Sequence, residues 1–545
     1  MSTREEALKT GSRHLRGSIL EELEVDGAFS REAVQILKFH GTYQQNDRDA
    51  RKTGAIAVPG SMVRVGIPGG ILTPAQYLAL DGLADTAGDG SMRITSRQDI
   101  QFHRVSKTRL RPLIRLLNEN LLTTLAACGD VVRNVISCPA PFAGEWRAEV
   151  YRHALDLSRR FKPATRAYYE IWIDGVKTAA AQAVEDEEPL YGPAYLPRKF
   201  KIGFAAPGDN CIDVYTNDVG IVPLCGEGGL EGFTVLAGGG LGFSPGVRAS
   251  HPRLADPVCT VDPDQLFDVV RAIVTIHRDF GNRSNRKLAR LKYVFEEWGP
   301  ARFLEELAAR VGRTLRAPRP VAWSRGHDHL GWRRQGDGRW FLGVRVLDGR
   351  ISGGLRSTLR EAVPLAGEVR LTAQQNLLLA HIPEARRRTV ERLFAGAAEL
   401  PPVLRHSMAC PALPTCGQAI TEAERVSPEV LRDIQQKLRD AGLGDMAVTV
   451  RMTGCPNGCA RPATAEIGII GQSVDMYALY LGGSPLGTRL GEPYASNVRR
   501  DDIGETLAPA FALFAGNRLP GESFGDFCHR TGIAELRQAC TGAAA

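Results

Sequence analysis

Two stretches in opposite halves of the chain repeat one another. The first, "MRITSRQDIQFHRV" (92–105), aligns without a gap with the second, "VRLTAQQNLLLAHI" (369–382), and both are preceded by strand-like and helical patterns. A further pair, "VLAGGGLG" (235–242) and "LYLGGSPLG" (479–487), reads in both copies as a strand that runs into a glycine turn. These repeats predict two related halves with pseudo-twofold symmetry.

Helical patterns fall between the strand-like pieces, at 263–280, 301–311 and 428–443. We therefore expect an α+β fold, in several domains because 545 residues with 43% hydrophobic content exceed what one core holds. No apolar run approaches the ~20 residues of a membrane span, and the N-terminus "MSTREEALKT" has no hydrophobic signal region. We expect a cytoplasmic protein without a membrane partner.

The eleven cysteines are sparse and odd in number, which favours thiol ligands over disulfides in a chain without an export signal. Four of them form C-x5-C at Cys410 and Cys416 and C-x3-C at Cys455 and Cys459, in loops rich in proline and glycine. Such loops offer backbone N–H groups to the sulfurs of an iron–sulfur cluster, which takes four thiolates. A structural zinc, for which the first spacing is unusual, and free buried cysteines are the alternatives.

Several cations lie where a folded domain would not bury them without a partner. Lys199 and Lys201 are two apart in "YLPRKFKIGF", so in an extended strand both point to one side. Arg64 and Arg133 each interrupt an apolar strand pattern. Three more basic residues belong to the first repeat stretch: Arg93, Arg97 and His103. Singly each fits an edge strand or a salt bridge, but together they indicate an anionic ligand, and no nucleotide-binding loop is present.

The cysteine pattern and its surroundings resemble one known family. "SMACPALPTC" and "TGCPNGCARPATAEIGIIG" carry the cysteines, and "FHGTYQQNDRD", "YLPRKFK", "HRDFGNRSNRK" and "LGGSPLGTR" extend the match over nearly the whole chain. The resemblance is to the sulfite and nitrite reductases that contain sirohaem and a 4Fe-4S cluster, especially the haemoprotein (beta) subunit of the assimilatory NADPH-dependent sulfite reductase. It implies a pseudo-twofold fold of three domains around both cofactors and the six-electron reduction of sulfite to sulfide.

The resemblance also implies roles for single residues. The cluster ligands would be Cys410, Cys416, Cys455 and Cys459, with Cys459 also bridging to the sirohaem iron. The active-site cations around sulfite would be Arg64, Arg133, Lys199 and Lys201. The residues lining the macrocycle would be Arg93, Arg97, Gln101, His103, Arg198, Gln375 and Asn457. Arg290 stands where the family has a lysine that contacts a sirohaem carboxylate, and it keeps the charge. Tyr43 and Cys128 match positions that some relatives crosslink, and whether they are linked here stays open.

The expected layout has four parts. An N-terminal extension covers 1–61, a split ferredoxin-like repeat domain covers 62–125 and 331–397, a first sirohaem-binding domain covers 126–330, and a second one that carries the cluster covers 398–545.

Two other functions compete with sulfite reduction. A ferredoxin-dependent nitrite reductase that forms ammonia shares the fold and cysteine spacing, but paired Lys199 and Lys201 favour sulfite. A zinc-stabilised RNA-binding protein is the distant alternative, and it lacks aromatic residues interleaved with the basic ones, so we expect no nucleic-acid partner. Because no flavin or nicotinamide motif is present, a partner must deliver electrons; the resemblance favours a flavoprotein subunit that uses NADPH over ferredoxin.

Overall fold

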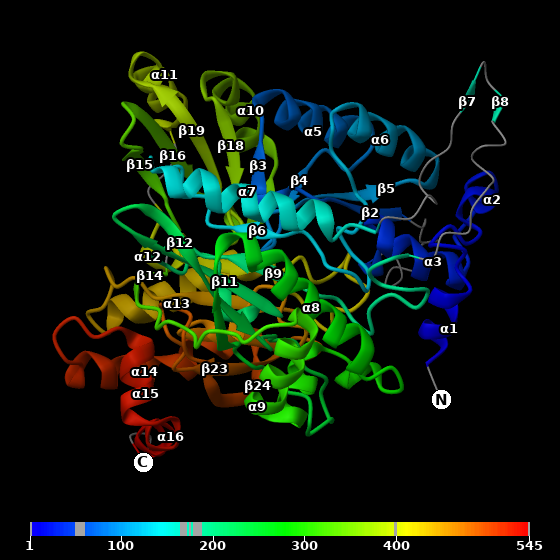
Figure 1. Ribbon diagram of the computed structural model, residues 1–545. Coiled ribbons are helices and arrows are strands. Elements are labelled where there is room, and N and C mark those ends of the chain that lie inside the picture. Colours follow the sequence, from blue (N-terminus) through cyan, green and yellow to red (C-terminus); the bar gives the residue numbers. More distant parts are fainter. Residues whose placement is uncertain are drawn as a thin grey trace.

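The computed structural model describes most of the chain. The described residues are 3–49, 60–163, 172–173, 176–177, 188–326, 328–396 and 400–542. Their strands form four five-stranded sheets and two ribbons, one of β7 (Trp172–Ile173) with β8 (Val176–Lys177) and one of β10 (Gly208–Asp209) with β14 (Trp323–Arg325). Helices pack around the sheets (Figure 1), so the predicted mixture of helices and strands is confirmed.

The first repeat forms two sheets that exchange strands. One sheet has the order β1 (Thr42–Gln45), β2 (Gly60–Val65), β5 (Ile100–Val105), β4 (Met92–Ile94) and β17 (Arg350–Ile351). The other has the order β15 (Gly331–Arg334), β16 (Arg339–Val344), β19 (Leu377–Pro383), β18 (Glu368–Leu371) and β3 (Ile71–Leu72). The short β17 comes from the second half of the chain yet pairs with β4, and β3 comes from the first half yet pairs with β18. Each copy therefore completes the sheet of the other.

The hairpin turns of the two copies have the same geometry. Gln98 lies between β4 and β5, and Gln375 lies between β18 and β19; both have positive φ, 57° and 64°. A glycine packs against each turn, Gly70 against that of Gln98 and Gly349 against that of Gln375, where a Cβ atom would meet a carbonyl oxygen of the opposite copy. The predicted pseudo-twofold relation of the first repeat is confirmed.

Four helices share one continuous hydrophobic core with both of these sheets. They are α5 (Pro74–Thr86), α6 (Lys107–Glu119), α10 (Gly353–Ala362) and α11 (Glu384–Phe394). The first begins with a capping box, in which the Thr73 hydroxyl accepts from the Gln76 N–H and the Gln76 side chain accepts from the Thr73 N–H. Because the core spans both copies, the exchanged strands are held by packing as well as by pairing.

The second repeat forms the other two sheets. One has the order β6 (Ile136–Ser137), β9 (Ile202–Phe204), β11 (Val219–Gly226), β12 (Gly229–Ala237) and β13 (Asp256–Val261). The other has the order β20 (Ser407–Ala409), β21 (Val450–Thr453), β22 (Ile467–Ser473), β23 (Met476–Leu481) and β24 (Glu492–Arg499). Both start with three parallel strands and end with two antiparallel ones. The matched glycine turns follow β12 and β23, as the sequence predicts.

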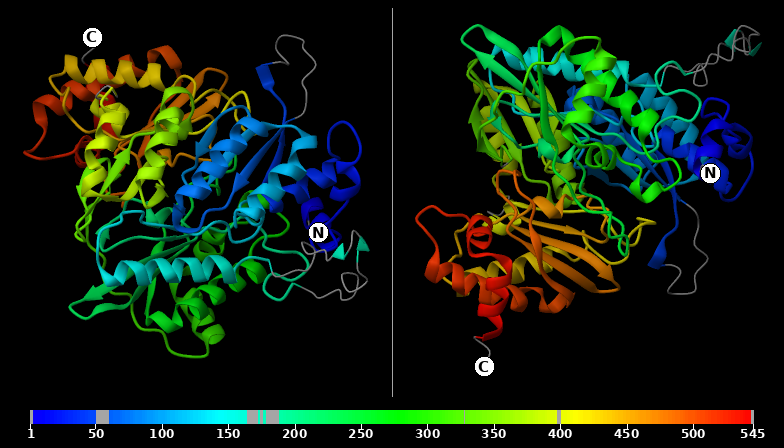
Figure 2. Two further views of the ribbon diagram at one scale, coloured as in Figure 1. Left: turned by 90° about the horizontal axis from the view of Figure 1, so that it is seen from above. Right: turned by 60° about the horizontal axis from the view of Figure 1, so that its bottom comes forward.

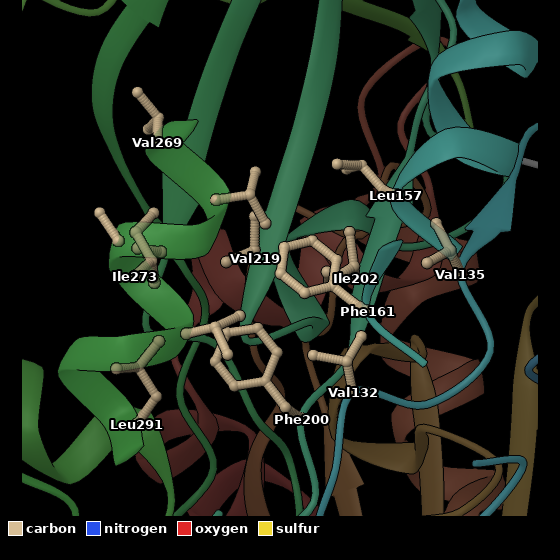
Figure 3. Close-up of a cluster of buried hydrophobic side chains, with 14 of the residues drawn as sticks. Val132, Val135, Leu157, Phe161, Phe200, Ile202, Val219, Val269, Ile273 and Leu291 are labelled. Atoms are coloured by element: carbon tan, nitrogen blue, oxygen red, sulfur yellow. The ribbon is translucent and has the colours of Figure 1, made fainter. Parts of the chain in front are cut away.

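The first of these sheets packs against α7 (Glu145–Arg160), α8 (Leu266–Phe280) and α9 (Leu291–Val311). Figure 3 shows Phe200 and Ile202 in the middle of this core, with Ile273 of α8 on one side and Leu157 of α7 on the other. The apolar side chains of "FDVVRAIVTIH" recur at helical spacing, which puts them on the face of α8 that meets the sheet. Phe200 is therefore anchored, and so is the segment around it.

The remaining helices lie at the two ends of the molecule. The second sheet of this repeat packs with α12 (Pro402–Arg405), α13 (Ser427–Asp440), α14 (Ile503–Asn517), α15 (Phe524–Thr531) and α16 (Ile533–Gly542). Figure 2 shows this part, in orange and red, far from the N-terminal helices α1 (Arg4–Thr10), α2 (Ile19–Leu23) and α3 (Arg31–Leu37). Within the described residues, no helix is both long and apolar enough to cross a membrane.

Candidate functional site

One cavity of about 650 Å³ brings together the residues predicted to form the site. It lies where β2, β4 and β5 meet the segment before β9 and the loops after β20 and β21. Its volume is typical of cofactor sites. All predicted site residues except Arg290 line it: Arg64, Arg93, Arg97, Gln101, His103, Arg133, Arg198, Lys199, Lys201, Gln375, Cys410, Cys416, Cys455, Asn457 and Cys459.

The four cysteines come from two loops that leave neighbouring strand ends. Because β20 and β21 pair in parallel, the loops after them start at the same edge of the sheet. The Gly454 N–H donates to Cys410 Sγ at 3.4 Å, and Asn457 Nδ2 donates to Cys455 Sγ at 3.5 Å. A side chain at position 454 would overlap the carbonyl oxygen of Thr421, so this turn requires glycine. The loops thus present sulfur atoms together with N–H donors.

The spread of these sulfur atoms bears on the choice of metal. Among the described residues, the one set of three or more Cys, His, Asp or Glu donors that lie within 4.8 Å of one another is elsewhere, at Cys138, Asp209, Cys211 and His329. A tetrahedral zinc with bonds of about 2.0–2.3 Å holds its donors only about 3.3–3.8 Å apart. The loop cysteines (Cys410, Cys416, Cys455 and Cys459) are spaced more widely than that, which disfavours a single zinc among them.

The loop thiols resist ionisation in the isolated protein. Burial raises the pKa of Cys410 well above its usual value and that of Cys455 to about 11, and the negative charge of Cys459 adds to both shifts. Metal binding requires thiolates, so the loops need a positively charged group among them. Iron atoms of a cluster would supply it.

Lys199 and Lys201 lie on either side of Phe200. Phe200 is fully buried in the core and its N–H donates to the carbonyl oxygen of Val131 at 3.1 Å. Because side chains alternate along an extended segment, the two lysines turn to the cavity instead. The sequence predicts this common side correctly, although β9 itself begins only at Ile202.

Both lysines are held in a positively charged neighbourhood. Burial, followed by the charges of Arg198 and Arg133, lowers the pKa of Lys199 to about 7. Burial, followed by Arg290 and Lys199, lowers the pKa of Lys201 well below its usual value. No acidic side chain of the described residues forms an ion pair with either ammonium. An anion bound beside them would restore their charge and would itself be stabilised.

Two guanidinium groups face the same cavity. Arg64 and Gln101 are opposite each other in β2 and β5. With its amide oxygen turned toward Arg64, Gln101 accepts from Nη2 at 2.6 Å and from Nε at 3.2 Å. Arg133 donates from Nε and Nη2 to the carbonyl oxygen of Gly129, both at 3.2 Å. These neutral partners orient the two guanidinium groups without cancelling their charge.

Several buried polar atoms on the cavity wall have no hydrogen-bond partner among the described residues. They are Arg97 Nε, both ring nitrogens of His103, and Gln375 Oε1. Buried polar groups are rarely left unpaired, so these atoms indicate a ligand. A macrocycle that carries several carboxylates would supply acceptors for Arg97 and His103. The wall therefore fits a large anionic cofactor.

Two further arginines, Arg93 and Arg290, support segments of the cavity through their hydrogen bonds. Arg93 donates from Nη2 to the carbonyl oxygen of Ala409 at 2.8 Å, directly before Cys410, and so joins the first repeat to a cysteine loop. Arg290 lies outside the lining and donates from Nη2 to Asp218 Oδ2 at 2.6 Å. The Lys201 N–H donates to the same carboxylate oxygen at 2.8 Å. In this structure Arg290 supports the segment that carries Lys201.

Other residues line the cavity that the sequence did not single out. Lys38 and Arg286 are among them, and Arg286 Nη2 pairs with Asp130 Oδ2 at 2.7 Å. Arg286 belongs to "HRDFGNRSNRK", one of the stretches that carry the family resemblance, so this motif could have pointed to it. Tyr43, which the family resemblance does single out, also lines the cavity. Burial, followed by the neighbouring Cys128, raises the pKa of Tyr43 to about 12. Tyr43 and Cys128 are therefore neighbours, and whether they are crosslinked stays open.

Comparison with known proteins places this cavity in a family. Residues 157–315 match the model described as the nitrite and sulphite reductase 4Fe-4S domain. Residues 57–120 and 333–397 match the nitrite/sulfite reductase ferredoxin-like half domain. The chain belongs to the nitrite and sulfite reductase family. The half-domain match covers most of the two strand-exchanged sheets but not β1, whereas the loop cysteines lie beyond the first match, in the second copy of its sheet.

Named relatives of the family match over nearly the whole chain. A sulfite reductase (NADPH) hemoprotein beta-component from Myxococcus xanthus is 44% identical and covers 97% of this chain and 96% of that protein. A sulfite reductase (ferredoxin) from Synechococcus elongatus is 42% identical and covers 98% of this chain and 90% of that protein. The solved structure of the Mycobacterium tuberculosis NirA protein has a TM-score of 0.80 at 25% identity and covers 97% of both chains. Membership of this family supports an iron–sulfur cluster and a haem-type cofactor.

Proposed function

We propose that this chain is the haemoprotein of an assimilatory sulfite reductase, an oxidoreductase that reduces sulfite to sulfide with six electrons. One observation carries the proposal: the loop cysteines and four cations converge on a single cavity. The cations are Arg64, Arg133, Lys199 and Lys201. The relatives described above, which are named sulfite reductases, support the choice of reaction.

The proposed cofactors are sirohaem and a 4Fe-4S cluster. The loop cysteines would hold the cluster, with Cys459 shared with the sirohaem iron. The residues proposed to hold the macrocycle and its carboxylates are Arg93, Arg97, Gln101, His103, Arg198, Gln375 and Asn457, with Arg290 acting through Asp218. When bound, the two groups supply stored electrons and an iron that takes the substrate. The unpaired wall atoms described above support this assignment.

The chain's own residues bind and protonate the anion. Arg64 and Arg133 are oriented by neutral partners, so they keep their charge, and their remaining N–H groups can attract the oxygens of sulfite. Lys199 and Lys201 add charge where negative charge builds up as electrons arrive. With its pKa lowered to about 7, Lys199 gives up a proton readily near neutral pH, as a general acid must when an oxygen leaves as water.

We infer that the electrons come from a separate protein. The name of the Myxococcus xanthus relative supports an NADPH-dependent flavoprotein subunit, which we propose, and that of the Synechococcus elongatus relative supports ferredoxin as the alternative donor. We also propose a cytoplasmic location, because free thiols for a cluster persist in a reducing compartment. The proposed domain division is 1–61, 62–125 with 331–397, 126–330, and 398–545. The sheets support it except at the first boundary, because β1 and the start of β2 lie within 1–61 and pair into the sheet of the second part.

The deciding experiment is an absorption spectrum of the protein expressed with sirohaem synthesis, with iron and acid-labile sulfide assayed on the same sample. We expect a haem-like Soret band, a band in the red, and about five irons and four sulfides per chain. Colourless protein without iron would overturn the proposal.

Steady-state assays with a chemical reductant then compare sulfite with nitrite, and assays with NADPH and a flavoprotein or with reduced ferredoxin identify the donor. We expect a higher kcat/KM for sulfite. A higher value for nitrite would transfer the assignment to the nitrite reductase alternative.

A further inference from the structure

Four metal-ligand side chains meet at a second place, outside the cavity of the proposed cofactors. Their ligand atoms all lie within 4.8 Å of one another, and they belong to Cys138, Asp209, Cys211 and His329. His329 Nε2 lies 3.0 Å from Asp209 Oδ2 and 3.9 Å from Cys138 Sγ. We propose that these four residues bind one structural zinc ion.

The donor set and its spacing suit zinc. Thiolate, imidazole and carboxylate are its usual ligands, and bonds of about 2.0–2.3 Å at tetrahedral angles put donor atoms about 3.3–3.8 Å apart. The measured 3.0 Å and 3.9 Å need only small side-chain movements to reach that range. Two thiolates with an imidazole favour zinc over magnesium or calcium. Three of the four donors are buried, since His329 is 0%, Cys211 2% and Asp209 6% exposed, and Cys138 is half-buried. Four protein ligands in a mostly buried place are typical of structural rather than catalytic zinc sites.

Surrounding contacts hold the donors in place. The Cys211 N–H donates to Asp209 Oδ1 at 3.1 Å, which leaves Oδ2 to face His329. The His329 ring packs edge-on against Phe142 with 5.9 Å between centroids. Such outer contacts fix the orientation of ligands before a metal binds. Three segments contribute: the end of β6, the turn that follows β10, and the link between β14 and β15.

The first of the two cysteines occupies the place of a proposed cluster ligand in the other copy of the repeat. Cys138 directly follows β6, and Cys410 directly follows β20, the corresponding strand. The Cys138 N–H donates to Phe204 of the next strand at 3.0 Å, and the Cys410 N–H donates to Met452 of the next strand at 3.1 Å. The two cysteines are therefore equivalent under the pseudo-twofold relation.

The second cysteine has the same relation to Cys459. The loop after β9 and the loop after β21 each end in a 3-10 helix that begins after a residue with positive φ, Asp213 at 52° and Arg461 at 55°. Cys211 stands two residues before Asp213, and Cys459 stands two residues before Arg461. The first copy thus keeps two of the thiol positions of the cluster loops, and Asp209 and His329, which come from other positions, complete a set compact enough for one ion.

A metal here would brace the wall of the cofactor cavity. Asp328, next to His329, accepts from Thr372 Oγ1 at 2.8 Å and from Asn376 Nδ2 at 2.6 Å. These two residues flank the turn that carries Gln375 to the cavity. A metal ion that holds His329 would therefore also hold the turn that carries Gln375.

The test is a metal analysis of the holoenzyme with zinc and iron measured on the same sample. We expect one zinc per chain in addition to the iron, and a zinc K-edge spectrum with two sulfur ligands at about 2.3 Å and two nitrogen or oxygen ligands at about 2.0 Å. Asp209→Asn and Cys211→Ser should lower the zinc content by about tenfold or more while the Soret band is retained. The matched control is Cys225→Ser, a cysteine of β11 outside the group, which should keep its zinc.

Three results would overturn the site. One is wild-type holoenzyme without zinc after growth and incubation with zinc sulfate. Another is bound zinc whose spectrum lacks sulfur ligands. The third is an intact mass lower by two hydrogens with a peptide linking Cys138 to Cys211, because a disulfide would then occupy the place of the metal. Iron content reports on the proposed reaction and zinc content on this site, so either can fail alone.

Discussion

Asp213 and Arg461 occupy corresponding positions in the two copies of the second repeat and bind each other, with Arg461 Nε donating to Asp213 Oδ2 at 2.6 Å. Arg451 Nη1 donates to the same oxygen at 2.6 Å, and all three side chains are buried. One carboxylate thus forms ion pairs with two guanidinium groups where the two copies meet.

This relationship predicts a large loss of stability for Asp213→Asn. The substitution leaves two buried guanidinium groups without a counter-charge, which lowers the free energy of unfolding by about 3–5 kcal/mol. Urea denaturation measures the change. The control is Asp262→Asn, which removes a solvent-exposed pair with Arg316 and should cost less than about 1 kcal/mol. Equal losses for both variants would show that the buried triad does not hold the copies together.

The two equivalent glutamines of the first repeat should differ in effect. Gln98 is engaged within the protein, donating to the carbonyl oxygens of Ser137 and Leu371, both at 2.8 Å, so Gln98→Ala should lower the free energy of unfolding by about 1–3 kcal/mol. Gln375 lines the cavity with Oε1 unpaired, so Gln375→Ala should leave stability nearly unchanged and weaken retention of the haem-type cofactor about tenfold. Chemical denaturation and titration of the Soret band separate the two. Reversed effects would contradict the assignment of Gln375 to the cofactor.

Lys201→Asn tests the choice of substrate. Removing one charge beside the anion should lower kcat/KM for sulfite more than that for nitrite, so that the ratio of the two falls about tenfold or more. Steady-state kinetics with both anions measure the ratio. The control is Lys437→Asn, which removes an exposed ion pair with Glu505. This substitution should change kcat/KM for neither anion. An unchanged ratio in Lys201→Asn would remove our basis for preferring sulfite.

The lowered pKa of Lys199 predicts a pH dependence of stability in the cofactor-free protein. Above about pH 7 the folded state releases a proton that the unfolded state keeps up to its ordinary pKa, so stability rises with pH in this window. Within this window, Lys199 raises the free energy of unfolding by about 1.4 kcal/mol per pH unit. Lys199→Gln should flatten the rise by that amount when urea unfolding is compared between pH 7.5 and pH 9.5. A variant with the wild-type slope would show that Lys199 is not neutral in the folded state.

Cys459→Ser tests the shared ligand. We expect the variant to lose the coupled absorption spectrum and most of its labile sulfide, because this cysteine is proposed to hold both metal centres. Ser96 Oγ donates to the Cys459 carbonyl oxygen at 2.8 Å, so the loop keeps its place when the sulfur is removed. Cys225→Ser should keep the wild-type spectrum. Retention of both iron and the coupled spectrum in Cys459→Ser would exclude the bridging role.

The sequence predicted the repeats and the loop cysteines because each carries a local pattern, whereas Gln101, Arg198 and Asn457 were assigned to the cavity only through the family resemblance. The hairpins around Gln98 and Gln375 align without a gap, and the spaced cysteines with their glycines have few other uses. The exchange of β3 and β17 had no such signal, since strands of two residues are too short to show alternation.

The zinc donors were hidden for a related reason. Cys138, the pair Asp209 and Cys211, and His329 lie in three distant segments, so no spacing motif connects them. The position of Arg290 outside the cavity lining was also beyond sequence reasoning, because only the packed structure shows that Arg290 donates to Asp218, whose carboxylate also accepts from the Lys201 N–H.

The exchanged strands also constrain how the protein is made. During synthesis, the first copy of the repeat leaves the ribosome with the edge of β4 uncovered, because its partner β17 has not yet been translated. An uncovered edge strand invites pairing with other chains. A nascent chain stalled or truncated between the two copies would therefore expose a template for aggregation, and chaperone protection would be needed until Arg350 and Ile351 emerge.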